Sequence, residues 1–464
     1  MQIPFATTSY QSESLFLSAQ RLVNLYAERI PEEAKSPVAL FGTPELKLRQ
    51  TVGVGPNRGQ IVMNKKLFIV SGPALWRVEG DGSATNIGVV PGNSSVQMSH
   101  NGTQIAVLTG GAPTDLFIAT ETNVTQVTDP DYPGASSVAF LDGYFLFTET
   151  ASGRWFICAS YNGLEFDALE FATAEGSPDN LIRVFVNQRE AWLFGEETTE
   201  VWYNSGNADF PFERASGANI ERGTVSGASI SGLDNSLIWV GEDRVIYRAD
   251  GYRPTRISTH PIEEVLESFV GLGDLISFSY TQKGHAFYVL KKPGHFTFVY
   301  DVSTGLWHER ESHGRPDYRV SWYSDVFGAR IASDDKTGNI YEMDITRHGS
   351  ENGESVVAIA TSPPLWAKTE FATMNSLIVD VETGVGLNDG QGADPQIMLD
   401  WSDDGGKTWS NEHWTSMGKI GEYTRRAKWD RMGQFYQRVL RVRISDPVRR
   451  VMNGAYADIE RGRL

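Results

Sequence analysis

The chain has 464 residues, of which 40% are hydrophobic and 21% are charged, with 46 glycines and 20 prolines. This composition excludes a mainly disordered or collagen-like chain, and the length suggests about three domains at roughly 150 residues each. The net charge of −17, from 41 Lys and Arg against 58 Asp and Glu, argues against tight binding to the outside of DNA. An acidic protein as a whole repels a polyphosphate.

Cysteine content and the amino-terminal sequence exclude further classes of protein. The single cysteine, Cys158, excludes an intrachain disulfide or a zinc ribbon, and its apolar neighbours in RWFICAS predict a buried, inert thiol. The first residues, MQIPFATTSYQSESLFLSAQR, lack the early basic charge and the apolar core of a secretory signal. Apolar runs elsewhere are far shorter than the ~20 residues of a membrane helix, so we expect no membrane segment.

Residues 1–40 are predicted to form an N-terminal arm, with one helix around Ser18 to Ile30, because alternation is weak there. The stretch from Pro44 to Val52, PELKLRQTV, is a candidate closing strand for the last unit of the repeat that follows. From Arg58 onward, four short apolar runs separated by turn residues recur as a meander. Successive units begin near Arg58, Ser94, Ser136, Asn180, Gly223, Leu275 and Asp317.

The spacing of these units is typical of a β-propeller. Second strands start 46 residues apart at Ala191 and Leu237, and 37 apart at Leu67 and Gln104, close to the roughly 40 to 50 residues of one blade. Asn101-Gly102 and Asp142-Gly143 are strong signals for tight hairpins. Residues 41–345 therefore predict an all-β propeller of seven blades, or six if a terminal unit is split. A pair of long β-sandwiches is the rival fold.

After Asp344 the period is lost, and residues 346–464 predict a C-terminal β-sandwich. This region holds one Asp-box pattern, S-x-D-x-G-x-T-W, with Ser402, Asp404, Gly406 and Trp409 at its defining positions. Short polar side chains can accept hydrogen bonds from the turn backbone, and glycine permits positive φ, so the motif predicts a stabilised hairpin. Asp boxes are known from sialidase propellers, which makes an extracellular carbohydrate-active propeller, hydrolase or lectin, the alternative function.

No pattern in the chain predicts catalysis. Glycoside hydrolysis needs two carboxylates across a cleft, and the cluster of Glu196, Glu197 and Glu200 is interpreted as a solvated loop. The eight histidines show no metal-ligand spacing, and His285 with His295 is interpreted as a hairpin surface. No phosphate-binding glycine motif is present. We therefore predict no catalytic residue, no cofactor and no metal site.

A basic cluster stands out near the carboxy terminus of this acidic chain. The residues that define it as a candidate subunit-docking patch are Arg425, Arg426, Arg438, Arg441 and Arg443. Arg441 and Arg443 share one face of a predicted strand. Three interpretations stay open: a solvated sheet face, a docking patch for an acidic neighbour such as another copy of the chain, or a weaker nucleic-acid contact.

Four segments carry a resemblance to a known family. They are AQRLVNLYAERIPEEAKSPVALFGTPELKL (Ala19 to Leu48), EETTEVWYNSGNADFPFERASGANIERG (Glu196 to Gly223), VYDVSTGLWHER, and WSDDGGKTWS with RVLRVRISDP. In the expected order and over nearly the whole length, the chain resembles the tail hub or nozzle proteins of P22-type short-tailed bacteriophages, the packaged-DNA stabilisation family. The first segment carries Asn24, Tyr26, Thr43 and Pro44, and the second carries Glu200, Trp202, Tyr203 and Gly206, at recognisable positions.

This resemblance implies a non-enzymatic virion protein of the tail, assembled in the cytoplasm of the host bacterium. It implies a homo-hexameric ring below the portal and adaptor rings that forms the last part of the DNA conduit. Tail tip, needle or fibre proteins would attach to the ring, and genomic DNA would pass without sequence-specific binding. The acidic charge suits a wall past which DNA slides. A receptor-binding tail protein is a further alternative.

Overall fold

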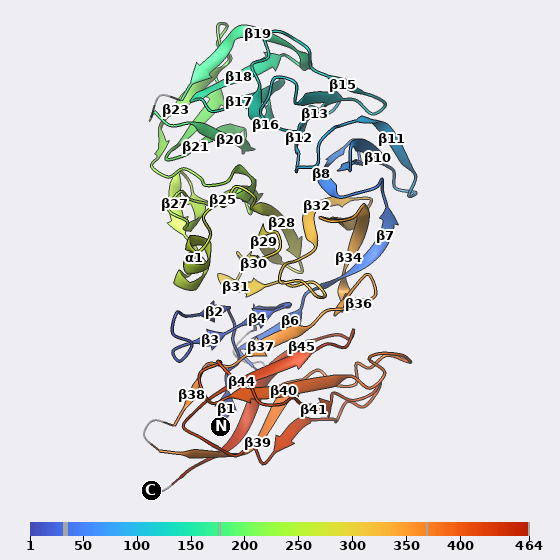
Figure 1. Ribbon diagram of the computed structural model, residues 1–464, viewed down its shortest axis with the longest axis vertical. Coiled ribbons are helices and arrows are strands. Elements are labelled where there is room, and N and C mark those ends of the chain that lie inside the picture. Colours follow the sequence, from blue (N-terminus) through green and yellow to red (C-terminus); the bar gives the residue numbers. More distant parts are fainter. Residues whose placement is uncertain (31–35, 175, 177, 368–369, 463–464) are drawn as a thin grey trace.

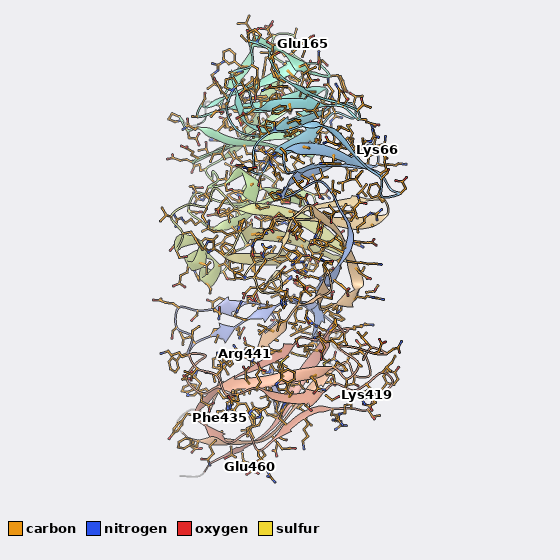
Figure 2. The ribbon with its side chains drawn as sticks, turned by 45° about the vertical axis from the view of Figure 1, so that its right-hand side comes forward. Lys66, Glu165, Lys419, Phe435, Arg441 and Glu460 are labelled. Atoms are coloured by element: carbon orange, nitrogen blue, oxygen red, sulfur yellow. The ribbon has the colours of Figure 1, made fainter. Side chains whose placement is uncertain are left out.

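The computed structural model describes residues 1–30, 36–174, 176, 178–367 and 370–462, and it is almost entirely β-structure. Two bodies lie one above the other along the long axis, a closed circle of sheets and a β-sandwich (Figure 1). Figure 2 shows the same elongated shape from another side, with Lys66 and Glu165 in the first body and Arg441 and Glu460 in the second. Within the described ranges, the helices are η1 (Gly227–Ser229) and α1 (His260–Glu267).

Six blades of the propeller are each built from four consecutive antiparallel strands of the described chain; five are separate sheets, and the sixth continues into a longer sheet. The first three comprise β8 (Asn57–Met63), β9 (Lys66–Ser71), β10 (Ala74–Val78), β11 (Ala84–Val89); β12 (Gln97–His100), β13 (Ile105–Leu108), β14 (Leu116–Ala119), β15 (Val124–Gln126); and β16 (Ala135–Leu141), β17 (Tyr144–Glu149), β18 (Arg154–Ala159), β19 (Asn162–Thr173). The next three comprise β20 (Leu181–Asn187), β21 (Glu190–Gly195), β22 (Thr199–Asn204), β23 (Phe212–Ile220); β24 (Ser231–Leu233), β25 (Ser236–Val240), β26 (Ile246–Asp250), β27 (Arg253–Arg256); and β28 (Ile276–Gln282), β29 (His285–Lys292), β30 (Phe296–Asp301), β31 (Leu306–Glu309).

One more four-stranded unit closes the circle, and it uses a strand from near the amino terminus. Here β32 (Val320–Val326), β33 (Ala329–Asp334) and β34 (Asn339–His348) are completed by β7 (Pro44–Thr51), which pairs antiparallel with β34. The first strand β32 contacts both β28 and β8, so the end of the series meets its start. The predicted propeller and the predicted closing strand are confirmed, and the paired-sandwich alternative is wrong.

Apolar side chains that point alternately to the two faces of each sheet explain why the sheets pack in a circle. In β9, Leu67 and Ile69 face one neighbouring blade, whereas Phe68 and Val70 face the other. Successive residues of a strand point to opposite faces, so a second strand that is apolar throughout supplies both faces. In the described chain, seven apolar clusters lie between adjacent propeller sheets in this way.

A repeated hairpin joins the first and second strands of most blades. Its two turn residues both have positive φ, as at Asp142 (47°) and Gly143 (99°), which is the backbone of a type I′ turn. Other pairs with this property are Asn64-Lys65, Gln188-Arg189, Asp234-Asn235, Lys283-Gly284 and Phe327-Gly328. Asn101-Gly102 differs, because the chain makes a longer turn in which the Gln104 N–H donates to the Asn101 side chain.

The second body is a β-sandwich, as predicted, with its core between two sheets. One sheet contains β1 (Gln2–Ile3), β5 (Leu25–Arg29), β6 (Val38–Gly42), β39 (Ala372–Val381), β42 (Ala427–Asp430), β43 (Gln434–Phe435) and β45 (Val451–Arg461). The other contains β37 (Ala358–Thr361), β38 (Leu365–Trp366), β40 (Gln396–Ser402), β41 (His413–Ser416) and β44 (Gln437–Ile444). Short strands between the bodies are β2 (Tyr10–Gln11), β3 (Ala19–Gln20), β4 (Leu22–Val23), β35 (Ser350–Glu351) and β36 (Glu354–Ser355).

The helix predicted around Ser18 to Ile30 is wrong, because this stretch forms β3, β4 and β5. The run from Leu22 to Ala27 is buried at every residue, Asn24 included. It lies between the two bodies and is covered on all sides, so its pattern shows no strand alternation. Asn24 has a φ of 53°, which separates β4 from β5 and is incompatible with a continuous helix.

We expect the closing strand to be required for stability of the propeller. Leu46 in β7 is fully buried beside Tyr26 and Tyr341, whereas Leu48 on the same strand is 39% exposed. Leu46→Ala should lower the free energy of unfolding by about 2–5 kcal/mol, because it leaves a cavity. Leu48→Ala should cost less than about 1 kcal/mol. Denaturant unfolding followed by tryptophan fluorescence measures both, and equal losses would contradict the role given to β7.

Candidate functional site

The junction between the two bodies is one continuous run of hydrogen-bonded strands. The short strand β4 pairs parallel with β31 of a propeller blade through Val23 and Glu309. It pairs antiparallel with β37 of the sandwich through Val23 and Ile359. A ten-stranded sheet therefore crosses from the propeller into the sandwich. Because hydrogen bonds along such a sheet resist hinge motion, the two bodies are expected to move as one unit.

Asn24 connects the two bodies beside this crossing point. Its side-chain amide donates to the carbonyl oxygens of Glu311, which follows β31, and Val357, which precedes β37, each at 2.9 Å. Its side-chain oxygen accepts from the Glu311 N–H at 3.2 Å. Asparagine tolerates left-handed backbone better than most residues, and the side chain here also satisfies backbone groups of both bodies.

Arg21, next to β4, adds an ionic contact to the junction. Its guanidinium pairs with the carboxylates of Glu309 and Glu311, the latter at 2.7 Å. All three side chains are 30% exposed or less. A bidentate contact of an arginine with two half-buried carboxylates is stronger than a typical surface ion pair.

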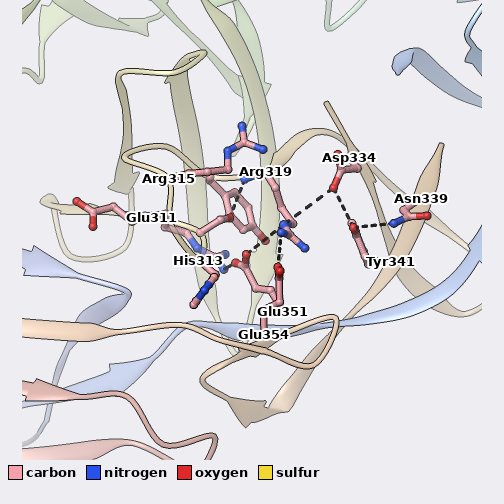
Figure 3. Close-up of polar contacts among 12 residues, drawn as sticks. Glu311, His313, Arg315, Arg319, Asp334, Asn339, Tyr341, Glu351 and Glu354 are labelled. Carbon is pink, nitrogen blue, oxygen red and sulfur yellow. Dashed lines mark hydrogen bonds and ion pairs between the residues drawn. The ribbon is translucent and has the colours of Figure 1, made fainter. Parts of the chain in front are cut away.

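A buried charged cluster lies where the last propeller unit meets the sandwich (Figure 3). The Glu351 carboxylate is nearly inaccessible and faces Arg319 at 3.5 Å and Arg310 at 3.8 Å. The Arg310 guanidinium also lies over the ring of Tyr318, 3.7 Å from its centre. Burial raises the pKa of Glu351, and the charge of Arg310 opposes that rise.

Arg315 joins a second group of charges in the same region. It binds Asp317 and Asp335, at 2.8 Å and 2.6 Å, and Asp335 also pairs with the fully buried Lys291 at 2.6 Å. Burial alone would raise the pKa of Asp317 and Asp335. Hydrogen bonds from Arg315 and the charge of Lys291 outweigh burial, so the pKa of each aspartate is lowered. Both carboxylates are therefore ionised at neutral pH.

The Asp-box residues form a closed hydrogen-bonded turn after β40. Asp404 accepts from the N–H groups of Lys407 and Thr408, each at 2.9 Å, and from the Ser402 hydroxyl at 2.7 Å. The Ser402 oxygen in turn accepts from the Gly406 N–H, where φ is 96°. Hydrogen bonds from Thr408 and then Ser402 lower the pKa of Asp404. The carboxylate is thus fully engaged in holding the turn.

Trp409 of the Asp box packs against the strand that carries the predicted basic patch. The Arg441 guanidinium lies 3.7 Å from the centre of a Trp409 ring. Arg441 and Arg443 both bind Asp400, at 2.6 Å and 2.7 Å. The Asp box therefore supports the sheet face on which these arginines lie.

The five predicted docking residues fall into two groups. Arg438 is buried and binds Asp403 at 2.7 Å, so it and the two Asp400-bound arginines already have carboxylate partners within the chain. Arg425 and Arg426 are exposed on the loop between β41 and β42. Sequence spacing alone did not separate these groups, because the acidic partners Asp400 and Asp403 lie on a different strand or turn.

The surface interpretation holds for Glu196, Glu197 and His295, which are exposed, but it is wrong for Glu200 and His285. The interpretation of Cys158 as a buried thiol is confirmed. Glu200 is buried, and accepts from the Gly176 N–H at 2.6 Å and the Trp202 ring N–H at 2.9 Å. His285 is also buried, with its Nδ1 2.7 Å from Asp301. Cys158 is buried, and burial raises the pKa of its thiol to about 11. Glu200 was missed because the loop that holds Gly176 covers it, and His285 because its partner Asp301 lies on the neighbouring strand β30.

Two searches of the described residues bear on metals and membranes. Among them, no three His, Cys, Asp or Glu side chains gather closely enough to hold a metal ion. No helix in that part of the chain combines the length and apolar character required to cross a bilayer.

The circle of blades and the sandwich that follows it both match one class of bacteriophage structural protein. Residues 1–348 match the family model described as bacteriophage P22 Gp10, beta-propeller, and residues 359–460 match bacteriophage P22 Gp10, beta-sandwich. The chain therefore belongs to the P22 Gp10 family, a P22-type tail protein family of packaged-DNA stabilisation. The predicted family membership is confirmed.

Other comparisons are distant. No curated protein matches the chain. Similar solved structures include the computationally designed Ika8 protein, at 10% identity and a TM-score of 0.41, covering 65% of this chain and 100% of Ika8. The Pan2 WD40 domain of Neurospora crassa has 9% identity and a TM-score of 0.41, covering 62% and 89%. BamB from Moraxella catarrhalis has 10% identity and a TM-score of 0.40, covering 70% and 98%.

We expect Glu351 to hold the junction together. Glu351→Ala leaves Arg310 buried without its carboxylate, which should lower the free energy of unfolding by about 3–5 kcal/mol. Glu354 supplies the matched control, because its side chain is 48% exposed although it binds Arg319 at 2.6 Å. Glu354→Ala should cost at most about 1 kcal/mol. Urea unfolding measures both, and a Glu351→Ala protein as stable as the control would remove the cluster's structural role.

Acid should weaken the fold through Asp317 and Asp335. Because their folded-state pKa values are lowered, these carboxylates stabilise the fold above the unfolded pKa of about 3.9, and the contribution is lost as pH falls below it. Asp335→Asn should reduce stability at pH 7 and flatten its decline towards pH 3. Asp250→Asn, at an exposed position, should leave the stability at pH 7 and its decline towards pH 3 unchanged. Urea unfolding midpoints measured between pH 3 and 7 test this prediction. It is contradicted if the midpoint of Asp335→Asn falls with decreasing pH as steeply as that of the unaltered protein.

Proposed function

We propose that this phage virion protein forms a ring at the distal end of a short tail. In this role, six copies surround the DNA conduit as a nozzle or hub. The ring connects the adaptor ring, below the portal, to the tail tip, needle or fibres, and it acts mechanically rather than as an enzyme. Copies assemble in the host cytoplasm and remain in the virion tail.

The observation that carries this proposal is the match of both bodies to the P22 Gp10 family, over residues 1–348 and 359–460. The rigid junction supports it, because a ring that transmits force between tail parts requires bodies that do not hinge. The net charge of −17 suits a wall that DNA passes without adhering. The single Asp box supports a structural role, because the Asp404 carboxylate is occupied by the turn.

A contact between copies is proposed for the loop that carries Arg425 and Arg426. Next to them, Tyr423 is 74% exposed and Ile420 is 59% exposed. The loop is held by the sandwich, since the Thr383 hydroxyl donates to the Tyr423 carbonyl at 2.9 Å. Apolar side chains flanked by exposed arginines suit contact with an acidic protein surface, and other copies of this acidic chain supply such a surface.

Electron microscopy of purified tails or virions tests the ring directly. Antibody or gold labelling of this chain should mark a ring with sixfold symmetry at the tail end farthest from the capsid. Finding the chain elsewhere in the particle, or only as a free monomer in infected cells, would contradict the proposal.

Reversing the loop charges should weaken ring formation. In the Arg425→Glu/Arg426→Glu double variant, the loop repels an acidic neighbour, so self-association should weaken at least about tenfold. Arg253→Glu, at an exposed propeller position, is the matched control and should associate as the unaltered protein does. Sedimentation velocity across a concentration series measures both, and equal association in the two variants would reject this loop as the contact.

A further inference from the structure

We propose that the axial cavity of the propeller binds a small oxyanion, a phosphate or a carboxylate, through Arg183. The cavity has a volume of about 750 Å³. Its lining comes from each blade of the described circle, and includes Gln60, Gln97, Ser136, Arg183, Ser277 and Trp322. Nothing in the proposed tail role requires a small ligand at this place.

Arg183 is an interior cation without a carboxylate partner. It lies on β20, the first strand of its blade, and none of the ion pairs among the described residues involves it. Burial lowers its pKa to about 10, and no neighbouring charge contributes to that shift. The guanidinium therefore remains protonated at neutral pH. A partly buried cation without a counterion loses solvation, and an anion supplied from solution would offset that cost.

The hydrogen bonds of Arg183 leave part of its guanidinium free. Its Nη1 donates to the Gly227 carbonyl at 2.8 Å, and its Nε is buried without any partner. The Phe185 ring lies 5.8 Å from the guanidinium carbon. Arginine presents its N–H groups as a planar fork that fits two oxygens of a phosphate or a carboxylate. Because Nε is closed to solvent and Nη1 is bound to Gly227, Nη2 is the guanidinium nitrogen through which such a ligand would bind.

The neighbouring backbone makes room for this arginine. A Cβ atom on residue 227 would lie 3.0 Å from Arg183 Cδ and 3.1 Å from its Cβ. Glycine at this place in η1 therefore lets the arginine side chain lie flat against the helical turn. The position of the guanidinium is set by the fold, which reduces the entropy lost when a ligand binds.

The rest of the lining carries little opposing charge. Asp274 lies on the cavity wall, but its carboxylate binds Lys292 at 2.5 Å. The Gln97 amide donates to the Ser136 carbonyl at 3.0 Å, and the Ser277 hydroxyl donates to the Ala228 carbonyl at 2.9 Å. These neutral groups are already paired with the protein. The charge of Arg183 is thus left uncompensated, and it favours an anion over a cation or a neutral sugar.

Isothermal titration of the full chain with sodium phosphate tests the site, with sodium chloride at matched ionic strength as the reference. Phosphate should bind the unaltered protein and raise its thermal midpoint. Arg183→Gln should weaken binding at least about tenfold, whereas Arg253→Gln, at an exposed position, should bind as the unaltered protein does. Sodium malonate in place of phosphate distinguishes a carboxylate site from a phosphate site.

Arg183→Lys provides a second variant that keeps the charge but lacks the fork. It should fold and bind more weakly than the unaltered protein, which separates ligand binding from loss of the fold. Without ligand, Arg183→Gln should be about as stable as the unaltered protein or more so, because it removes a partly buried charge that has no carboxylate partner. Equal affinity in Arg183→Gln and unaltered protein, or no binding of either anion at about 10 mM, roughly ten times the Kd of a weak millimolar site, would overturn the proposal.

Discussion

Burial of both faces of every propeller sheet is the constraint on which the rest of the structure depends. A four-stranded sheet with an apolar second strand is unstable if either face is exposed to water, and a neighbouring sheet on each side buries both faces. The circle must then close, and β7 completes the sheet that meets the first blade. The closing strand follows directly on β4, β5 and β6, so the same segment that closes the propeller also builds the junction and one sandwich sheet.

This topology determines where the buried charges of the junction lie. Strands from near the amino terminus, the last propeller sheet and the start of the sandwich meet in a small volume. The segment between β31 and β32 carries Arg310 and Arg319, and the short strand β35 carries Glu351. Buried ions of this kind are costly when alone, and they favour one arrangement of the surrounding strands because only that arrangement pairs them. The charged junction and Arg183 are separate features, because Arg183 lies on β20, in a blade that forms a separate sheet from the ten-stranded sheet of the junction.

Local repetition made most of the fold predictable. Blade spacing, the Asp142-Gly143 turn and the Asp box depend on neighbouring residues, and all of these appear in the structure. The turns at Gln188-Arg189 and Asp234-Asn235 lack the usual glycine, so their left-handed backbone is imposed by the strands on either side. The segment from Leu22 to Ala27 was misread because it is covered by parts of the chain hundreds of residues away. Pairing of Arg438 with Asp403, and burial of Glu200 beside Gly176, depend on contacts between different strands and loops, which spacing along the chain does not show.

The closing strand has a consequence for synthesis of the protein. Thr51 in β7 meets Asn339 in β34 across 288 positions of chain. At typical bacterial elongation rates, roughly 15 to 60 s separate the emergence of these two strands from the ribosome. During that interval β7 has an unpaired edge, and early blades lack a neighbour on one side. Nascent chains are therefore vulnerable to pairing with one another until translation passes the final propeller sheet, and a chaperone bound during that interval would favour correct closure.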